Sequence, residues 1–163
     1  MSVGYPLAPL LRVREFREEA AKNAVRAAER AVAEAEAETE RRRAELARYA
    51  VWREEEAERR YAAIMGASLS LKEVDEFKAG LGALADGELQ RREAMDRAEE
   101  EAGRCREALS QARDAARRAQ HETAKILAHR DIWREEARRE AERLEDVEME
   151  EFRTLPPQGT EED

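Results

Sequence analysis

The chain has 163 residues, of which 42% are charged and only 5% aromatic, and its formal net charge at pH 7 is −9. A composition dominated by Ala, Glu and Arg with few aromatic residues is typical of long helices and coiled coils rather than of a globular enzyme core. The acidic balance argues against a nucleic-acid binder, because contacts to phosphate need a clustered positive field.

The first predicted helix covers about residues 7–65. Prolines at positions 6 and 9 fit a helix start, and no further proline occurs until Pro156. The apolar stripe advances in alternating steps of three and four residues, the period of left-handed coiled coils. It comprises Ala21, Val25, Ala28, Val32, Ala35, Thr39, Arg42, Leu46 and Tyr49. Beyond Leu46 the stripe moves by about one position, as in a stutter, to Ala50, Ala57, Tyr61 and Ile64.

The predicted turn covers residues 66–70. Gly66 can adopt the left-handed conformation that ends a helix. Ser70 and Glu73 are spaced as a capping box, and Leu69 and Val74 as a hydrophobic staple, so a new helix is expected from residue 71. A connection this short folds the second helix back antiparallel to the first. We therefore predict an all-α fold, a long two-helix antiparallel coiled-coil hairpin over residues 1–155.

The second predicted helix covers about residues 71–152 and keeps one apolar stripe in the same alternation of steps. The stripe comprises Val74, Phe77, Leu81, Leu84, Glu88, Arg91, Met95, Ala98, Ala102, Cys105, Leu109, Ala112, Ala116, Ala119, Thr123, Ile126, Arg130, Trp133, Ala137, Glu140, Leu144, Val147 and Glu151. A helix of this length predicts a rod. Three glycines between positions 80 and 87 each weaken a helix, and we expect a kink or a mobile segment there.

A turn centred on Ser68 places residue i of the first helix opposite residue 137 − i of the second. This rule pairs Ala21, Val25, Ala28, Val32 and Ala35 with Ala116, Ala112, Leu109, Cys105 and Ala102, all on the predicted stripes. It also predicts a C-terminal helical overhang from Asp131 to Phe152, whose apolar residues have no intramolecular partner. Such a stripe either frays or binds another protein. Residues 156–163 are predicted to be a disordered tail.

No catalytic, metal or cofactor site is predicted. His121 and His129 are eight positions apart, beyond the four-residue spacing that lets two helical side chains share a metal, and Cys105 has no second cysteine to pair with. We expect a non-enzymatic protein with no cofactor. The mean hydropathy of −0.89 and the lack of an apolar run near 18 residues predict no membrane insertion, and we expect a cytoplasmic protein.

Several segments resemble the YscO family of type III secretion proteins. They are Tyr5-Pro6-Leu7 with Leu10-Leu11-Arg12-Val13-Arg14, Tyr49 to Glu56, Ile64-Met65-Gly66 with Leu69 to Lys78, and Glu148-Met149-Glu150-Glu151-Phe152. The resemblance implies a cytoplasmic, FliJ-like central stalk at the base of the secretion apparatus. Such a stalk links the hexameric secretion ATPase to the cytoplasmic ring of the export gate and is associated with secretion chaperones. The glycine-rich stretch after Phe77 departs from the continuous helix expected for the family.

The resemblance and the predicted hairpin together assign two contact surfaces. The ATPase-binding surface would consist of Leu10, Leu11, Arg12, Arg14, Phe16, Trp133, Leu144, Val147 and Phe152. The export-gate-binding surface would consist of Met65, Leu69, Leu71, Val74 and Phe77. The alternative is a self-associating coiled-coil scaffold or adaptor, in which the stripes pair between chains and the hairpin does not form.

Overall fold

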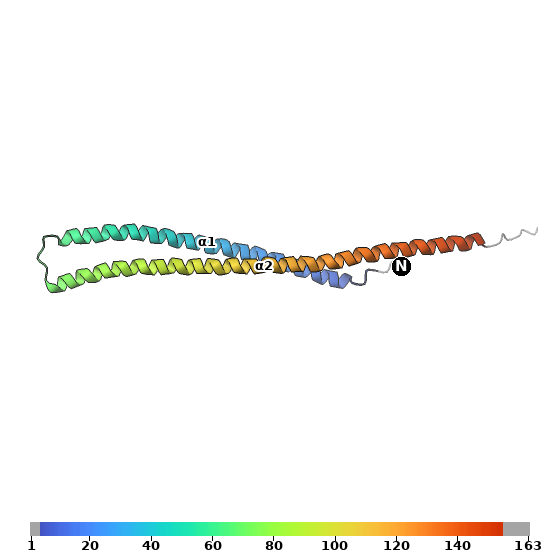
Figure 1. Cartoon of the computed structure of the whole chain (residues 1–163), viewed down its shortest axis with the longest axis horizontal. Helices are drawn as coiled ribbons and strands as arrows, with labels where there is room; N and C mark the ends of the chain where they lie inside the picture. Colours follow the sequence, from blue (N-terminus) through green and yellow to red (C-terminus); the bar gives the residue numbers. More distant parts are fainter. Residues whose placement is uncertain (1–3, 155–163) are drawn as a thin grey trace, which may run out of the picture. The chain divides into compact units, whose positions relative to one another are not determined.

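The computed structural model describes residues 4–154 and consists of two helices joined by a short turn (Figure 1). Helix α1 spans Ala8–Ile64 and helix α2 spans Leu71–Thr154. The prediction of an all-α antiparallel hairpin is therefore confirmed. Helix α2 continues two residues beyond the expected end at Phe152, and the predicted disordered tail, residues 156–163, lies outside the described residues.

Contacts divide the hairpin into two compact units. The turn unit is Lys22–Asp114 and contains the connection between the helices. The terminal unit combines the N-terminal residues up to Ala21 with the chain from Ala115 onward, of which residues 4–21 and 115–154 are described.

The turn has the predicted geometry. Gly66 has a φ of 78°, in the left-handed region that glycine adopts without steric cost, and the Ala67 N–H donates to the carbonyl of Ile64 at 3.1 Å. The Ser70 N–H donates to Glu73 Oε2 at 2.7 Å, and the Glu73 N–H donates to Ser70 Oγ at 3.2 Å. The left-handed Gly66 therefore ends the first helix, and the reciprocal capping box starts the second at Leu71.

The predicted stripe of α2 forms the face that packs on α1. Every stripe position from Val74 to Trp133 is buried or half-buried, whereas every later position is exposed. On α1 the predicted stripe is likewise half-buried or buried, except for Arg42, and Tyr61 of the displaced stripe is also exposed. The alternation of three- and four-residue steps thus identifies the interhelical seam.

The seam is thin. Among residues 4–154, only Leu11, Leu84 and Ala102 are buried apolar residues, at 7%, 7% and 2% exposure. Two threonines are also buried, and each hydroxyl donates to the carbonyl four residues earlier: Thr39 to Ala35 at 2.9 Å and Thr123 to Ala119 at 3.1 Å. Threonine can therefore occupy the seam without leaving a polar group unpaired.

The three glycines of α2 do not break the helix. The backbone is helical from Leu71 to Thr154, and Gly66 is the only described residue with a positive φ. Gly87 faces α1, where a Cβ atom would overlap Tyr49 Oη and lie 2.9 Å from Tyr49 Cζ. The helix tolerates a glycine here because the missing side chain gives a tyrosine ring room to pack on the backbone.

Candidate partner-binding surfaces

In the terminal unit, Tyr5, which precedes α1, packs against α2. The hydroxyl of Tyr5 lies 2.7 Å from His129 Nδ1, and the Tyr5 ring centroid is 5.5 Å from that of Trp133. The prediction that Trp133 has no intramolecular partner is therefore wrong. Tyr5 reaches α2 from upstream of the first helical residue, so the unpaired part of α2 begins after Trp133 and not at Asp131.

The predicted ATPase-binding residues of α1 divide into packed and exposed groups. Leu11 is buried in the seam, and Arg14 is half-buried with its Nη1 3.7 Å from Glu122 Oε2. Leu10, Arg12 and Phe16 are exposed, and Phe16 retains 76% exposure. Phe16 is thus the largest predicted contact on α1 that is open to a partner.

The distal α2 segment, residues 134–154, supplies the remaining predicted contacts. Its first half carries ion pairs within the helix, among them Arg138 to Glu135 at 2.8 Å and Arg143 to Glu140 at 2.7 Å. Its second half exposes large apolar side chains, namely Leu144, Val147, Met149 and Phe152. This segment is helical to Thr154 although no residue of α1 covers it.

The predicted export-gate surface surrounds the turn. Met65 and Leu71 are each 80% exposed. Leu69, Val74 and Phe77 are half-buried, and the Phe77 ring meets the Tyr61 ring edge-on with centroids 5.1 Å apart. The structure therefore leaves Met65 and Leu71 as the most accessible members of this predicted surface.

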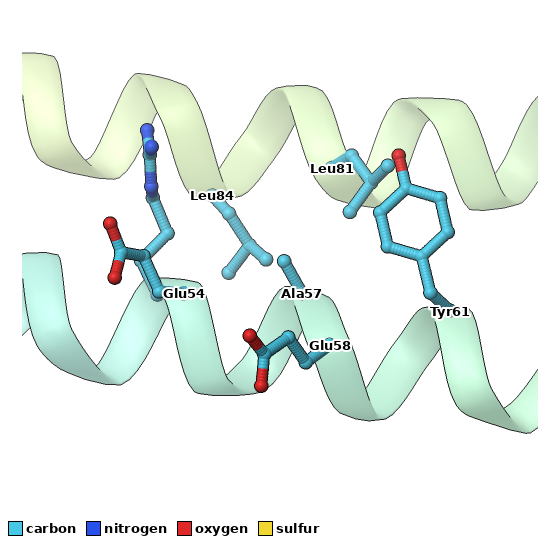
Figure 2. A pocket seen from close by; sticks show the side chains of 7 residues that line it. Glu54, Ala57, Glu58, Tyr61, Leu81 and Leu84 are labelled. Atoms are coloured by element: carbon cyan, nitrogen blue, oxygen red, sulfur yellow. The ribbon is translucent and has the colours of Figure 1, made fainter.

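A groove near the turn was not predicted from the sequence. It has a volume of about 430 Å³ and is lined by Arg53, Glu54, Ala57, Glu58, Tyr61, Leu81 and Leu84. Figure 2 shows both leucines pointing from α2 toward α1, with the tyrosine ring rising to meet them. The sequence signal for the groove is the shift of the α1 stripe after Leu46, because a displaced stripe packs less closely on its partner.

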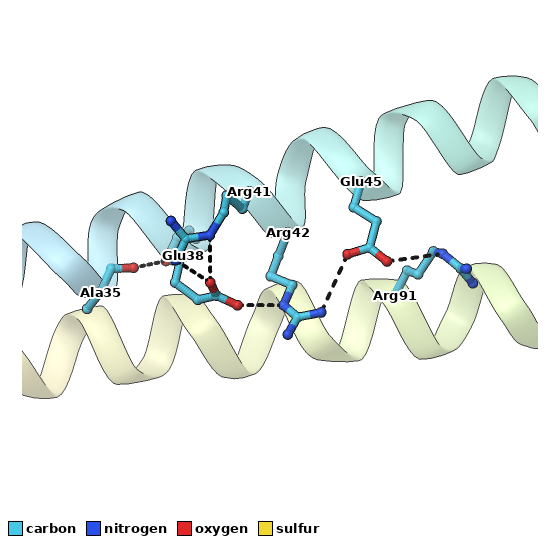
Figure 3. Close-up of polar contacts among 7 residues, drawn as sticks. Ala35, Glu38, Arg41, Arg42, Glu45 and Arg91 are labelled. Atoms are coloured by element: carbon cyan, nitrogen blue, oxygen red, sulfur yellow. Dashed lines mark hydrogen bonds and ion pairs between the residues drawn. The ribbon is translucent and has the colours of Figure 1, made fainter.

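Polar contacts fix the pairing of the helices in the turn unit. Tyr49 Oη donates to the carbonyl of Leu84 at 2.9 Å, and the Arg91 guanidinium lies 3.9 Å from the centroid of the Tyr49 ring. Glu45 accepts a hydrogen bond from Arg42 and forms an ion pair with Arg91, as Figure 3 shows. The predicted register places Tyr49 opposite Glu88, and these contacts flank that position on both sides.

Neighbouring arginines stabilise the charged form of two glutamates on the surface of α1. Hydrogen bonds from Arg41 and then Arg42 lower the pKa of Glu38 (Figure 3). The pKa of Glu56 is lowered in the same way by Arg59 and Arg60. Burial, followed by the nearby Glu101 carboxylate, raises the pKa of the Cys105 thiol, which favours its protonated and less nucleophilic form.

The structure does not indicate a metal or membrane site within the described residues. No three of their His, Cys, Asp or Glu side chains are grouped to hold a metal ion. Neither α1 nor α2 contains a stretch long and apolar enough to cross a membrane.

A two-helix antiparallel hairpin with one interhelical seam defines a coiled-coil protein. The family model described as type III secretion protein YscO matches residues 7–155. The chain therefore belongs to the YscO family of type III secretion proteins, structural components of that system, and the resemblance drawn from the sequence is confirmed.

Solved structures agree with this assignment. The crystal structure of the type III secretion protein YscO from Vibrio parahaemolyticus is 27% identical, covers 90% of this chain and 92% of its own, and has a TM-score of 0.84. The putative YscO homolog CT670 from Chlamydia trachomatis is 20% identical over 93% of both chains, with a TM-score of 0.75, and shares the fold. No curated protein matches the chain.

Proposed function

We propose that the chain is a non-enzymatic central stalk of a type III secretion system. In this proposal the terminal unit contacts the hexameric secretion ATPase, the turn contacts the cytoplasmic ring of the export gate, and the protein works at the cytoplasmic base of the apparatus. Membership of the YscO family supports the setting.

The main support for the proposal is that both units expose large apolar side chains. Phe16 in the terminal unit is 76% exposed, and Met65 and Leu71 beside the turn are each 80% exposed. Exposed apolar groups on a paired coiled coil add nothing to the hairpin itself, whereas burial against a partner would stabilise a complex.

The alternative of a self-associating scaffold is less well supported. Apart from Arg42, the stripe positions from Ala21 to Tyr49 and from Val74 to Trp133 are already buried or half-buried within one chain. Contacts across the hairpin, including Arg53 to Glu88 at 2.6 Å and Arg43 to Glu99 at 3.1 Å, also join the two helices of the same molecule.

The test is a crossed binding experiment with the ATPase and the export-gate ring of the same secretion system. We expect the full chain to co-purify with the ATPase and to stimulate ATP hydrolysis. Phe16→Ala should weaken ATPase binding by about tenfold and leave gate binding unchanged, because Phe16 belongs to the terminal unit. The double variant Met65→Ser, Leu71→Ser should weaken binding to the export-gate ring and leave ATPase binding unchanged.

Each variant is the control for the other, since all three residues are exposed and their replacement leaves the seam intact. Helicity measured by circular dichroism should be the same for all chains. Absence of ATPase binding by the unaltered chain would reject the proposal, and equal loss of both partners by both variants would reject the division into two contact surfaces.

A further inference from the structure

The distal α2 segment, residues 134–154, carries its charge unevenly. Its first half has matched arginines and glutamates that pair at helical spacing, including Arg138 with both Glu135 and Glu142, and Arg143 with Glu140. Between Leu144 and Phe152 the sequence contains acidic residues and no basic one. The acidic residues are Glu145, Asp146, Glu148, Glu150 and Glu151, and none of them forms an ion pair with another described residue.

Some of these carboxylates lie on the same side of the helix as exposed apolar side chains. With about 3.6 residues per turn, positions i, i+1, i+4, i+5 and i+8 share one side of a helix. Here they form a stripe, called the acidic-apolar stripe, of Leu144, Glu145, Glu148, Met149 and Phe152. Four of the five also line a shallow hollow of about 350 Å³ on this helix, together with Asp146.

This mixture limits what can cover the stripe. Another copy of the same segment would place carboxylates against carboxylates, which is unfavourable in an interface. An uncharged apolar groove would bury Glu145 and Glu148 without partners, at a large desolvation cost. A groove with an apolar floor and Lys or Arg side chains along its rim would bury the apolar side chains of the stripe and pair with its carboxylates.

We propose that the acidic-apolar stripe docks as a helix into such a basic-rimmed apolar groove on the secretion ATPase. The inference rests on the proposed stalk function and specifies the chemistry of its ATPase contact. Phe152, at 76% exposure, and Met149 supply the buried apolar surface. Glu145 and Glu148 pair with the basic rim, which makes the contact sensitive to salt.

The test compares two single charge reversals in the full chain. Glu148→Lys alters the stripe, whereas Glu150→Lys makes the same change in net charge on the opposite side of the same helix. We expect Glu148→Lys to weaken binding to the purified ATPase by about tenfold and to reduce the dependence of affinity on salt. Glu150→Lys should bind within about twofold of the unaltered chain, and the double variant Met149→Ala, Phe152→Ala should also bind weakly while keeping its salt dependence.

The outcomes separate this inference from the proposed function. If the unaltered chain does not bind the ATPase, the stalk function is rejected and the inference falls with it. If the unaltered chain binds and Glu148→Lys binds equally well, only the inference is overturned. Self-association of the unaltered chain that is lost in the Met149→Ala, Phe152→Ala variant would instead identify a second copy as the occupant and would also overturn it.

Discussion

The contact between Tyr49 and Gly87 shows how one pair of residues fixes the relation between two long helices. The phenol ring occupies the space where a side chain on Gly87 would lie, its hydroxyl donates to Leu84, and Arg91 covers its face. A shift of α2 by a single turn would remove all of these contacts. Tyr49 therefore specifies the register of the turn unit. The repeating seam alone would also allow registers shifted by a whole repeat.

Replacing Gly87 by alanine should destabilise the protein although alanine is the better helix former. The new Cβ atom displaces the Tyr49 ring and its hydrogen bond, so we expect the free energy of unfolding to fall by about 1–2 kcal/mol. Gly82→Ala is the matched control: nothing lies within 4 Å of a Cβ at that position, and the change should add about 1 kcal/mol through helix propensity. Urea denaturation followed by circular dichroism measures the free energy of unfolding of both variants.

A double-mutant cycle tests whether the clash with Tyr49 causes the destabilisation by Gly87→Ala. In a Tyr49→Ala background the clash is absent, and Gly87→Ala should then stabilise the helix as Gly82→Ala does. Destabilisation of equal size in both backgrounds would show that Tyr49 is not the reason for the glycine. The sequence identified Gly87 only as a weak helix position, because its role depends on a side chain 38 residues away that comes opposite it in the hairpin.

At the scale of the helix, pairs of glutamate and arginine within one turn stabilise the exposed faces of α1 and α2. Glu38 accepts from Arg41 at 2.6 Å and from Arg42 at 2.7 Å, and Glu56 has the same arrangement with Arg59 and Arg60. Each such pair contributes little in water, but they recur along both helices. They also couple helix stability to pH.

Stability should fall on acidification. In the folded chain the pKa values of Glu38, Glu56 and Glu73 lie below 4.5, the ordinary value for a glutamate. Their contribution is therefore present above about pH 4.5 and is lost as the pH falls through the lowered values. Melting temperatures measured by circular dichroism should be level from neutral pH to about pH 5 and decrease below it. The double variant Glu38→Gln, Glu56→Gln should show a smaller decrease.

A rise in melting temperature on acidification would contradict this expectation. It would mean that relief of repulsion in a chain of net charge −9 outweighs the loss of the paired carboxylates.

The elements that the sequence predicted well depend on local or periodic signals. The capping box at Ser70 and the seam positions from Val74 to Trp133 follow from fixed spacings along the chain, and the structure contains both. Two features escaped prediction because they depend on non-periodic packing. Tyr5 reaches α2 from outside any helical repeat, and the groove near Tyr61 forms where the α1 stripe changes phase.

For the molecule as a whole, pairing of both seams within one chain predicts a folded monomer. The melting temperature should then stay constant over about a hundredfold range of protein concentration, because unfolding does not involve dissociation. Circular dichroism at several concentrations, with sedimentation equilibrium on the same samples, provides the measurement. A melting temperature that rises with concentration would favour the self-associating scaffold.

The thin seam also bears on how freely the sequence can diverge. At a half-buried seam position that packs against alanine or threonine, the size of the side chain matters more than its shape. Many replacements therefore keep the helices paired. The Vibrio parahaemolyticus protein differs at nearly three positions in four and still superposes with a TM-score of 0.84. Substitutions can therefore accumulate on the outer faces of such a chain while the hairpin beneath them is preserved.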